Sequence, residues 1–201
     1  MLEEEYETSR RVLPAHLRPA PEPEPEFSYV LRDAVEADVP GIREIYNHYV
    51  LNSTVTFDEK AATLAQMRAK FAKARRLGMP WVVAEAPSGQ LIGTAWVLPW
   101  QDKAAYRFTV EDSIYLGPAA QGRGLGRALL SHLIDRSREA GLKEIISLIA
   151  DKGADASIAL HKKLGFREVG HMGKVGFKFD RWLGTVMLQK NLRKKDVANK
   201  R

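Results

Sequence analysis

Cysteine is absent from the 201-residue sequence. The absence excludes a disulfide framework, a thiolate metal site and a thiol nucleophile. No apolar run approaches the roughly 20 residues that a membrane-spanning helix needs. The start MLEEEYETSRR is acidic, where a signal peptide would be basic and then apolar. We therefore expect a cytoplasmic protein with no membrane partner.

The charge of the chain is unevenly distributed. The formal net charge is +6, but six basic residues and one acidic residue lie between Lys190 and Arg201, so this end alone supplies +5. Such an apolar-poor basic end is typical of a solvated tail. The alternative, a nucleic-acid interface, would show a steep dependence of binding on salt. We expect no nucleic-acid partner.

Residues 1–27 have the opposite character. They contain seven glutamates, three basic residues and the segment APEPEPE, which has nothing to bury. This composition predicts a flexible acidic extension. The chain therefore divides into the extension 1–27, one folded domain at 28–192 and a basic tail at 193–201.

Strand and helix periodicities alternate within the folded domain. Apolar spacing predicts helices at 36–51, 63–77, 125–140 and 155–164, the second of them dense in lysine and arginine on its outer face. Strands are predicted at 29–31, 81–84, 91–98, 107–116, 145–149, 167–175 and 185–188. Hairpins early in the chain and a strand-helix-strand unit later predict an α/β (α+β) fold in which helices cover both faces of a mixed sheet.

The segment QGRGLG at 121–126 follows a predicted strand and opens a predicted helix. A helix N-terminus has four N–H groups without an intrahelical partner, and its dipole favours an anion, so a phosphorylated ligand is expected here. A P-loop is excluded because no G-x-x-x-x-G-K-S/T string exists. A dinucleotide fingerprint starting at Gly122 would need a small residue where Arg127 stands. The pattern that remains is Q/R-x-x-G-x-G/A, for which a glycine turn without a ligand is the alternative.

This string resembles the acetyl-coenzyme A pyrophosphate loop of the GNAT acetyltransferase superfamily. The chain from about residue 29 to 192 resembles the phosphinothricin and methionine sulfoximine acetyltransferases in the segments IYNHYV, STVTF, AYRFTVEDSIYL, ASIALHKKLGF and VGFKFDRW. The resemblance implies a twisted, mostly antiparallel GNAT sheet that is splayed between its fourth and fifth strands, where the cofactor inserts. It also implies acetyl-coenzyme A as the acetyl donor and a homodimer. We expect no metal, because the five histidines show no metal-ligand spacing.

The resemblance assigns the cofactor-binding residues. The pantetheine arm would lie along Ile114, Tyr115 and Leu116, and the pyrophosphate in the loop of Gln121, Gly122, Arg123, Gly124, Leu125, Gly126 and Arg127. Lys163 would contact the phosphates, with a solvated lysine as the alternative. Ala154 stands where the family commonly has an asparagine that contacts the coenzyme, so no side-chain amide is present there.

Glu111 is the predicted catalytic base. Acetyl transfer to an amine needs a neutral nitrogen, so a proton acceptor must lie near the amine. The apolar neighbours of Glu111 would raise its pKa and suit it to this task; the alternative is a solvated strand glutamate. The family motif places its base at the glutamate of TVE.

His161 is the predicted catalytic acid. It stands where many GNAT enzymes have a tyrosine that protonates the departing thiolate, and an imidazole can do so near neutral pH. The alternative is a structural histidine.

The acceptor side departs from the family more than the cofactor side. The substrate-binding residues that the resemblance implies are Phe57, Lys103, Tyr106, Asp112 and Ser113. Lys103 lies where the family often has arginines facing the acceptor carboxylate, and it offers a point charge instead of a bidentate fork. Gly184 replaces an acidic residue usual after WL.

These observations together predict an acetyl-coenzyme A-dependent N-acetyltransferase. The acceptor would be the α-amino group of an amino acid or an analogue of the phosphinothricin or methionine sulfoximine type. Transfer would be direct, because no cysteine can carry an acetyl group and a ternary complex aligns the amine with the thioester. The alternatives are a peptide or protein N-acetyltransferase, against which Phe57 and Tyr106 indicate a closed pocket, and a coenzyme A-binding sensor, against which Glu111 argues.

Overall fold

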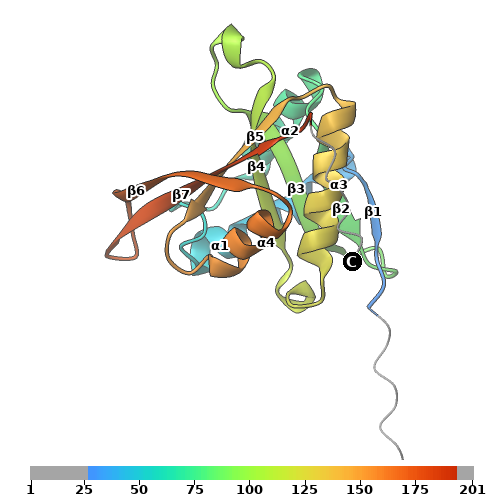
Figure 1. Ribbon diagram of the computed structural model, residues 1–201. Coiled ribbons are helices and arrows are strands. Elements are labelled where there is room, and N and C mark those ends of the chain that lie inside the picture. Colours follow the sequence, from blue (N-terminus) through green and yellow to red (C-terminus); the bar gives the residue numbers. More distant parts are fainter. Residues whose placement is uncertain (1–26, 194–201) are drawn as a thin grey trace, which may run out of the picture.

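A seven-stranded sheet organises the chain, in the strand order β1-β2-β3-β4-β5-β7-β6 (Figure 1). The computed structural model describes residues 27–193, so the predicted extension and basic tail lie outside the described residues apart from Phe27 and Arg193. The strands are β1 (Val30–Asp33), β2 (Trp81–Glu85), β3 (Leu91–Pro99), β4 (Thr109–Leu116), β5 (Glu144–Ala150), β6 (Arg167–Lys178) and β7 (Arg181–Asn191). β4 and β5 pair in parallel, and the other neighbouring strands pair antiparallel.

Helices cover both faces of this sheet, as predicted. α1 (Val39–Asn52) and α2 (Leu64–Arg76) pack on one face, and α3 (Leu125–Glu139) and α4 (Asp155–Lys163) pack on the other (Figure 1). α2 begins with a capping box in which the Gln66 N–H donates to the Thr63 hydroxyl and the Thr63 N–H donates to the Gln66 side chain. None of the helices within residues 27–193 is both long and apolar enough to cross a membrane.

Some element boundaries differ from the predicted ones. The helix predicted from residue 36 begins as a 3₁₀ turn at Glu36–Asp38, and α1 follows it with Pro40 in its first turn, where the missing N–H removes no hydrogen bond. The strand predicted from residue 107 begins at Thr109 because Ala104–Tyr106 forms a 3₁₀ turn. β6 and β7 are longer than predicted because they form a hairpin whose outer part has exposed apolar residues and no inward-outward alternation.

A wedge opens between the two parallel strands. β4 pairs with β5 only at Thr109↔Glu144, Val110↔Ile145 and Glu111↔Ile146. Beyond that point β4 continues along β3 as far as Leu116↔Gly93, while β5 continues along β7 as far as Ala150↔Thr185. The splay predicted between the fourth and fifth strands is therefore present.

Alternation along β4 sends successive side chains into the two layers. Val110, Ile114 and Leu116 belong to the apolar cluster beneath α3 and α4. Tyr115 belongs to the cluster beneath α1 and α2, so Glu111, two pleats away, shares that face. Glu111 and Asp112 are thus neighbours in sequence but lie on opposite sides of the sheet.

Candidate active site

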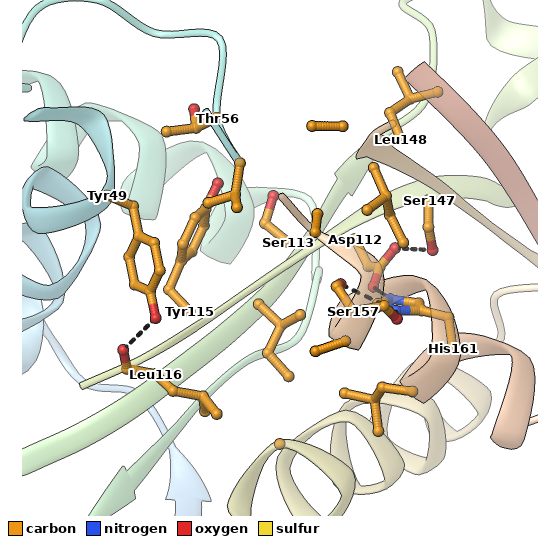
Figure 2. A pocket seen from close by; sticks show the side chains of 18 of the residues that line it. Tyr49, Thr56, Asp112, Ser113, Tyr115, Leu116, Ser147, Leu148, Ser157 and His161 are labelled. Carbon is orange, nitrogen blue, oxygen red and sulfur yellow. Dashed lines mark hydrogen bonds and ion pairs between the residues drawn. The ribbon is translucent and has the colours of Figure 1, made fainter. Parts of the chain in front are cut away.

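A pocket of about 530 Å³ occupies the wedge between β4 and β5 (Figure 2). Its walls come from α1 and the loop after it, from β4 and β5, from the start of α3 and from α4. The structure brings these predicted site residues to its lining: Phe57, Glu111, Asp112, Ser113, Ile114, Tyr115, Leu116, Gln121, Gly122, Gly126, Ala154 and His161. The strands that carry most of them diverge here, so the pocket reaches both layers of the fold.

Seven predicted residues do not line the pocket, namely Lys103, Tyr106, Arg123, Gly124, Leu125, Arg127 and Lys163. Lys103 and Tyr106 are exposed on the segment between β3 and β4, which projects beyond the sheet (Figure 1). Lys163 is exposed at the last position of α4, and the side chain of Leu125 is fully buried in the core. The structure therefore leaves the acceptor-binding prediction for Lys103 and Tyr106 without support from the pocket geometry.

The glycine loop has the backbone form that an anion cradle needs. Gly122 has φ +73° and Gly124, the N-cap of α3, has φ +81°. A Cβ at either position would meet nothing within 4 Å, so the requirement for glycine is conformational. The first N–H groups of α3 open beyond this cap, where a phosphate would satisfy them. Together with the apolar side chains of Ile114 and Leu116, the loop fits a phosphorylated ligand with an apolar arm.

Gly124→Val is expected to weaken acetyl-coenzyme A binding about tenfold or more. A β-branched residue at a left-handed φ is strained by about 1–3 kcal/mol, and relief of that strain would turn the cap and its N–H groups away from the phosphates. Isothermal calorimetry measures the dissociation constant. Gly89→Val is the matched control, because Gly89 has the same φ of +81° in the β2–β3 turn and the same open surroundings. Equal affinities for the two folded variants would remove the glycine loop from the site.

Glu111 lies half-buried on the side of the wedge that α1 and α2 cover. Burial raises the pKa of its carboxyl group, and the charge of Asp112 raises it further, while the Lys70 ammonium on α2 lowers it. A carboxylate whose pKa is raised toward neutral pH is a better proton acceptor than a fully solvated one. This environment matches the role predicted for Glu111.

Tyr49 is a pocket residue that the sequence analysis missed. Its hydroxyl donates to the Leu116 carbonyl at 2.7 Å (Figure 2) and accepts from the Gln121 side chain at 3.0 Å. These two bonds connect α1 to the end of β4 and to the glycine loop. Burial raises the pKa of Tyr49, so the phenol is neutral. The signal was the pair of tyrosines three apart on one helix face in IYNHYV.

A buried polar network of Ser147, Asp112, His161 and Ser157 lines the pocket on the side of the sheet that α3 and α4 cover (Figure 2). Ser147 on β5 donates to Asp112 at 2.5 Å, and the second Asp112 oxygen lies 2.9 Å from His161 Nε2. His161 Nδ1 donates to the Ser157 carbonyl at 2.8 Å, because a carbonyl only accepts. Burial by itself would lower the pKa of His161, but the hydrogen bond and charge of Asp112 and the Ser157 carbonyl outweigh it, so the pKa is raised.

This network bears on two of the predicted site residues. Asp112, predicted to bind the acceptor, directs both carboxylate oxygens at protein groups. His161, predicted to protonate the thiolate, lines the pocket, but both of its ring nitrogens are bonded within the protein. Ser147 was not predicted, because its partner Asp112 lies on another strand 35 positions away.

Two glycines in the β6–β7 hairpin lie where a side chain would clash with its surroundings. A Cβ at Gly176 on β6 would lie 2.5 Å from the Phe57 ring, so the absence of a side chain lets Phe57 pack against the strand. At Gly184 a Cβ would clash with the Asp151 carboxylate and the Met172 carbonyl, and the Gly184 N–H donates to Asp151 at 2.8 Å. The acidic side chain expected at position 184 from the family pattern has no room because Asp151 fills that space from the end of β5.

The histidine and acidic side chains of the described residues are the candidate metal ligands, since the chain has no cysteine. Across residues 27–193 no group of three or more histidine or acidic side chains is arranged to hold a metal ion.

The comparisons with known proteins agree with this geometry. A profile described as Acetyltransferase (GNAT) family matches residues 42–166. The chain belongs to this acetyltransferase family. It is 42% identical over 161 residues to a phosphinothricin N-acetyltransferase of Alcaligenes faecalis, covering 80% of this chain and 81% of that protein.

Two further acetyltransferases are similar to this chain. An L-methionine sulfoximine/L-methionine sulfone acetyltransferase of Pseudomonas aeruginosa is 42% identical over 166 residues, covering 83% of this chain and 96% of that one. The solved GNAT phosphinothricin acetyltransferase of Sinorhizobium meliloti, in complex with acetyl-coenzyme A, superposes with a TM-score of 0.78 at 43% identity, covering 85% and 94% of the two chains. These findings confirm the predicted fold and the predicted family.

Proposed function

We propose that this GNAT enzyme transfers the acetyl group of acetyl-coenzyme A to the amino group of a small amino-acid-like acceptor of the phosphinothricin or methionine sulfoximine type. The observation that carries the proposal is the pocket in the β4–β5 wedge, which joins the glycine loop at its cofactor end to Glu111 on the side that α1 and α2 cover, the proposed acceptor face. The names of the relatives support the acceptor class. Because acetyl-coenzyme A is supplied inside the cell, we place the reaction in the cytoplasm.

In a direct acetyl transfer, different residues of the wedge bind the cofactor, bind the thioester carbonyl and accept the proton. Acetyl-coenzyme A, when bound, supplies the activated acetyl group. Ile114, Tyr115 and Leu116 line the pocket where the pantetheine would lie, and the loop at 121–126 faces its phosphates. Among the backbone N–H groups of 113–115, that of Ile114 is the candidate donor to the thioester carbonyl. Ser113 and Tyr115 lie at the hydrogen-bonded positions opposite Trp96 and Thr94, so their N–H groups face β3. Glu111 accepts the proton that the ammonium group must lose before its nitrogen can form the new C–N bond.

His161 is the candidate source of the proton that the leaving sulfur requires. A histidine with Nδ1–H on a carbonyl and Nε2 facing a carboxylate holds a proton more firmly than a free imidazole, in line with its raised pKa. Asp112 therefore sets the protonation state of His161. Because Nε2 already faces Asp112, the His161–Asp112 pair also has a structural role. The role of His161 as the acid is a prediction.

The proposal is tested by a screen of amines with acetyl-coenzyme A, monitored by thiol release. Free amino acids and their sulfone, sulfoximine and phosphinate analogues form one set, and short peptides with the same N-terminal residues form the other. We expect turnover with members of the first set and none with the peptides. Turnover confined to peptides would show that the acceptor is a peptide and not a free amino acid. Tight acetyl-coenzyme A binding without turnover on either set would overturn the proposal that the protein is an enzyme.

We also propose that the enzyme is a homodimer. The β6–β7 hairpin extends from the body of the protein (Figure 1) and presents apolar side chains that are about half exposed, namely Val169, Val175, Phe177, Phe179 and Trp182. The Phe177 and Trp182 rings contact each other with centroids 5.3 Å apart. Several exposed apolar side chains on an edge hairpin are typical of an interface with another chain.

Trp182→Glu is expected to give a monomer. Light scattering should report twice the chain mass of 22.6 kDa for the unchanged protein and 22.6 kDa for the variant, because a carboxylate cannot be buried in the proposed apolar interface without a partner. Leu77→Glu, a similarly exposed apolar position at the end of α2, is the control that leaves the mass doubled. A monomeric unchanged protein, or a dimeric Trp182→Glu, would remove this surface as the interface.

A further inference from the structure

Lys70 on α2 is a cation held at the acceptor face of the wedge. Its side chain is half-buried, and its ammonium lies 5.1 Å from the centroid of the Tyr46 ring and 5.6 Å from that of Trp96. Cation–π contacts of this length fix an ammonium against aromatic faces. Lys70 is therefore not one of the solvated outer-face lysines that the composition of the helix indicated.

The register of β3 and β4 places Glu111 beside this cation. Trp96 pairs with Ser113 and Leu98 pairs with Glu111, so Trp96 and Glu111 are diagonal neighbours on the face that α1 and α2 cover. Diagonal neighbours in an antiparallel ladder lie about 7–8 Å apart, within reach of long side chains. An ammonium over Trp96 is consequently close to the Glu111 carboxyl group.

The titratable groups that act on Glu111 or on its neighbours Lys70 and Tyr115 come from several elements. The strand of Glu111 contributes Asp112 and the phenol of Tyr115, and α2 contributes Lys70. The loop after α1 contributes Asp58, which accepts a hydrogen bond from the Tyr46 hydroxyl of α1. β6 contributes Lys178, whose ammonium donates to the Thr56 carbonyl at 2.8 Å and interacts with the charge of Asp58. β5 places an uncharged residue, Ile146, in register with Glu111.

We propose that Lys70 is a positioning residue for the base: its ammonium, held over Tyr46 and Trp96, keeps Glu111 in the carboxylate form that can accept the proton. The inference rests on the proposed function, in which Glu111 is the base. Burial and the charge of Asp112 both favour a protonated Glu111, and the Lys70 charge opposes them. Burial lowers the pKa of Lys70 more than the charges of Asp58 and Glu111 raise it. Lys70 is therefore most fully protonated at acidic pH.

The first test compares pH profiles of kcat/KM. For Lys70→Met we expect a loss of about fivefold at pH 6 and less than about twofold at pH 8.5, because the protonated fraction of Glu111 grows only on the acidic side. Dividing kcat/KM of the variant by kcat/KM of the unchanged enzyme at the same pH removes the effect of the ionisation of the amine. Lys70→Arg keeps the charge and should restore most of the activity at pH 6.

Lys73→Met is the matched control. Lys73 lies one turn further along α2, is about half exposed, and faces Asp102 at 3.9 Å. Its removal changes the net charge of the enzyme equally without removing a charge beside Glu111, so no pH-dependent loss is expected. Lys70→Gln repeats the test with a polar end over the rings if the methionine variant folds poorly.

The second test does not depend on activity. The Glu111 side-chain carboxyl carbon is titrated by ¹³C NMR, with Glu111→Gln identifying its signal. We expect the midpoint to move to higher pH in Lys70→Met and to stay in place in Lys73→Met. An unchanged midpoint, or a loss of activity that is equal at both pH values, overturns the inference. A shifted midpoint in an enzyme that acetylates none of the amines tested would instead keep the inference about Lys70 and reject the proposed function.

Discussion

Glu111→Gln is expected to lower kcat/KM on the order of 10²–10⁴-fold while acetyl-coenzyme A still binds. Glutamine keeps the shape of the side chain but has no basic oxygen that can take the ammonium proton. The cofactor end of the pocket, formed by the glycine loop and the outer part of β4, is untouched by the change. The dissociation constant from calorimetry should therefore be close to that of the unchanged enzyme.

The pH dependence separates the loss of a base from damage to packing. At high pH more of the amine arrives neutral, so an enzyme without its base recovers activity relative to the unchanged enzyme, whereas one with damaged packing does not. Glu144→Gln is the control, because Glu144 is a half-buried glutamate at the start of β5 that bonds Gln189 and lies outside the pocket lining. Full activity of Glu111→Gln between pH 6 and 9 would show that solvent or another group accepts the proton.

Local patterns in the sequence were enough to predict the strand, glycine turn and helix start at 109–126. The apolar strand, the left-handed glycines and the helix start follow one another along the chain, and their geometry depends on backbone chemistry more than on distant partners. The splay between β4 and β5 was implied by the family resemblance, and the three-pair ladder confirms it. Composition or periodicity alone would not have shown it.

The acceptor half depends on contacts between distant segments, and there the prediction was weaker. Lys103 was selected because it stands where the family often has arginines, but it is exposed and does not line the pocket. Lys70 was read as part of a solvated lysine-rich face because helical periodicity cannot show that Trp96 from another strand lies beneath it. Ser147 was missed for the same reason, since a serine in an apolar strand has no signal until its partner is known.

Asp112→Ala is expected to lower the free energy of unfolding by about 3–5 kcal/mol, because it removes one member of a buried charged pair. The side chains of Asp112 and His161 are almost fully buried, and the aspartate also accepts from Ser147, so the variant leaves a buried imidazole and a buried hydroxyl without their partner. His171→Ala provides the contrast. His171 forms the same type of pair with Asp151 at 3.1 Å, but half of its side chain is exposed, and such a pair contributes less than about 1 kcal/mol.

The pH dependence of that loss follows from the direction of the pKa shift. The pKa of His161 is raised in the folded protein, so the stability contributed by its charged form is fully present below the unfolded histidine pKa of about 6.5 and is lost as pH rises through the folded value. Without Asp112, burial lowers the pKa of His161, and acid then favours the unfolded chain. Denaturant unfolding should therefore show the largest difference between the two proteins at acidic pH, shrinking as pH rises, and the double variant Asp112→Ala, His161→Phe should lose this pH dependence. An equal loss at every pH, or a loss no larger than that of His171→Ala, would mean that the pair stabilises the wedge through packing and not through charge.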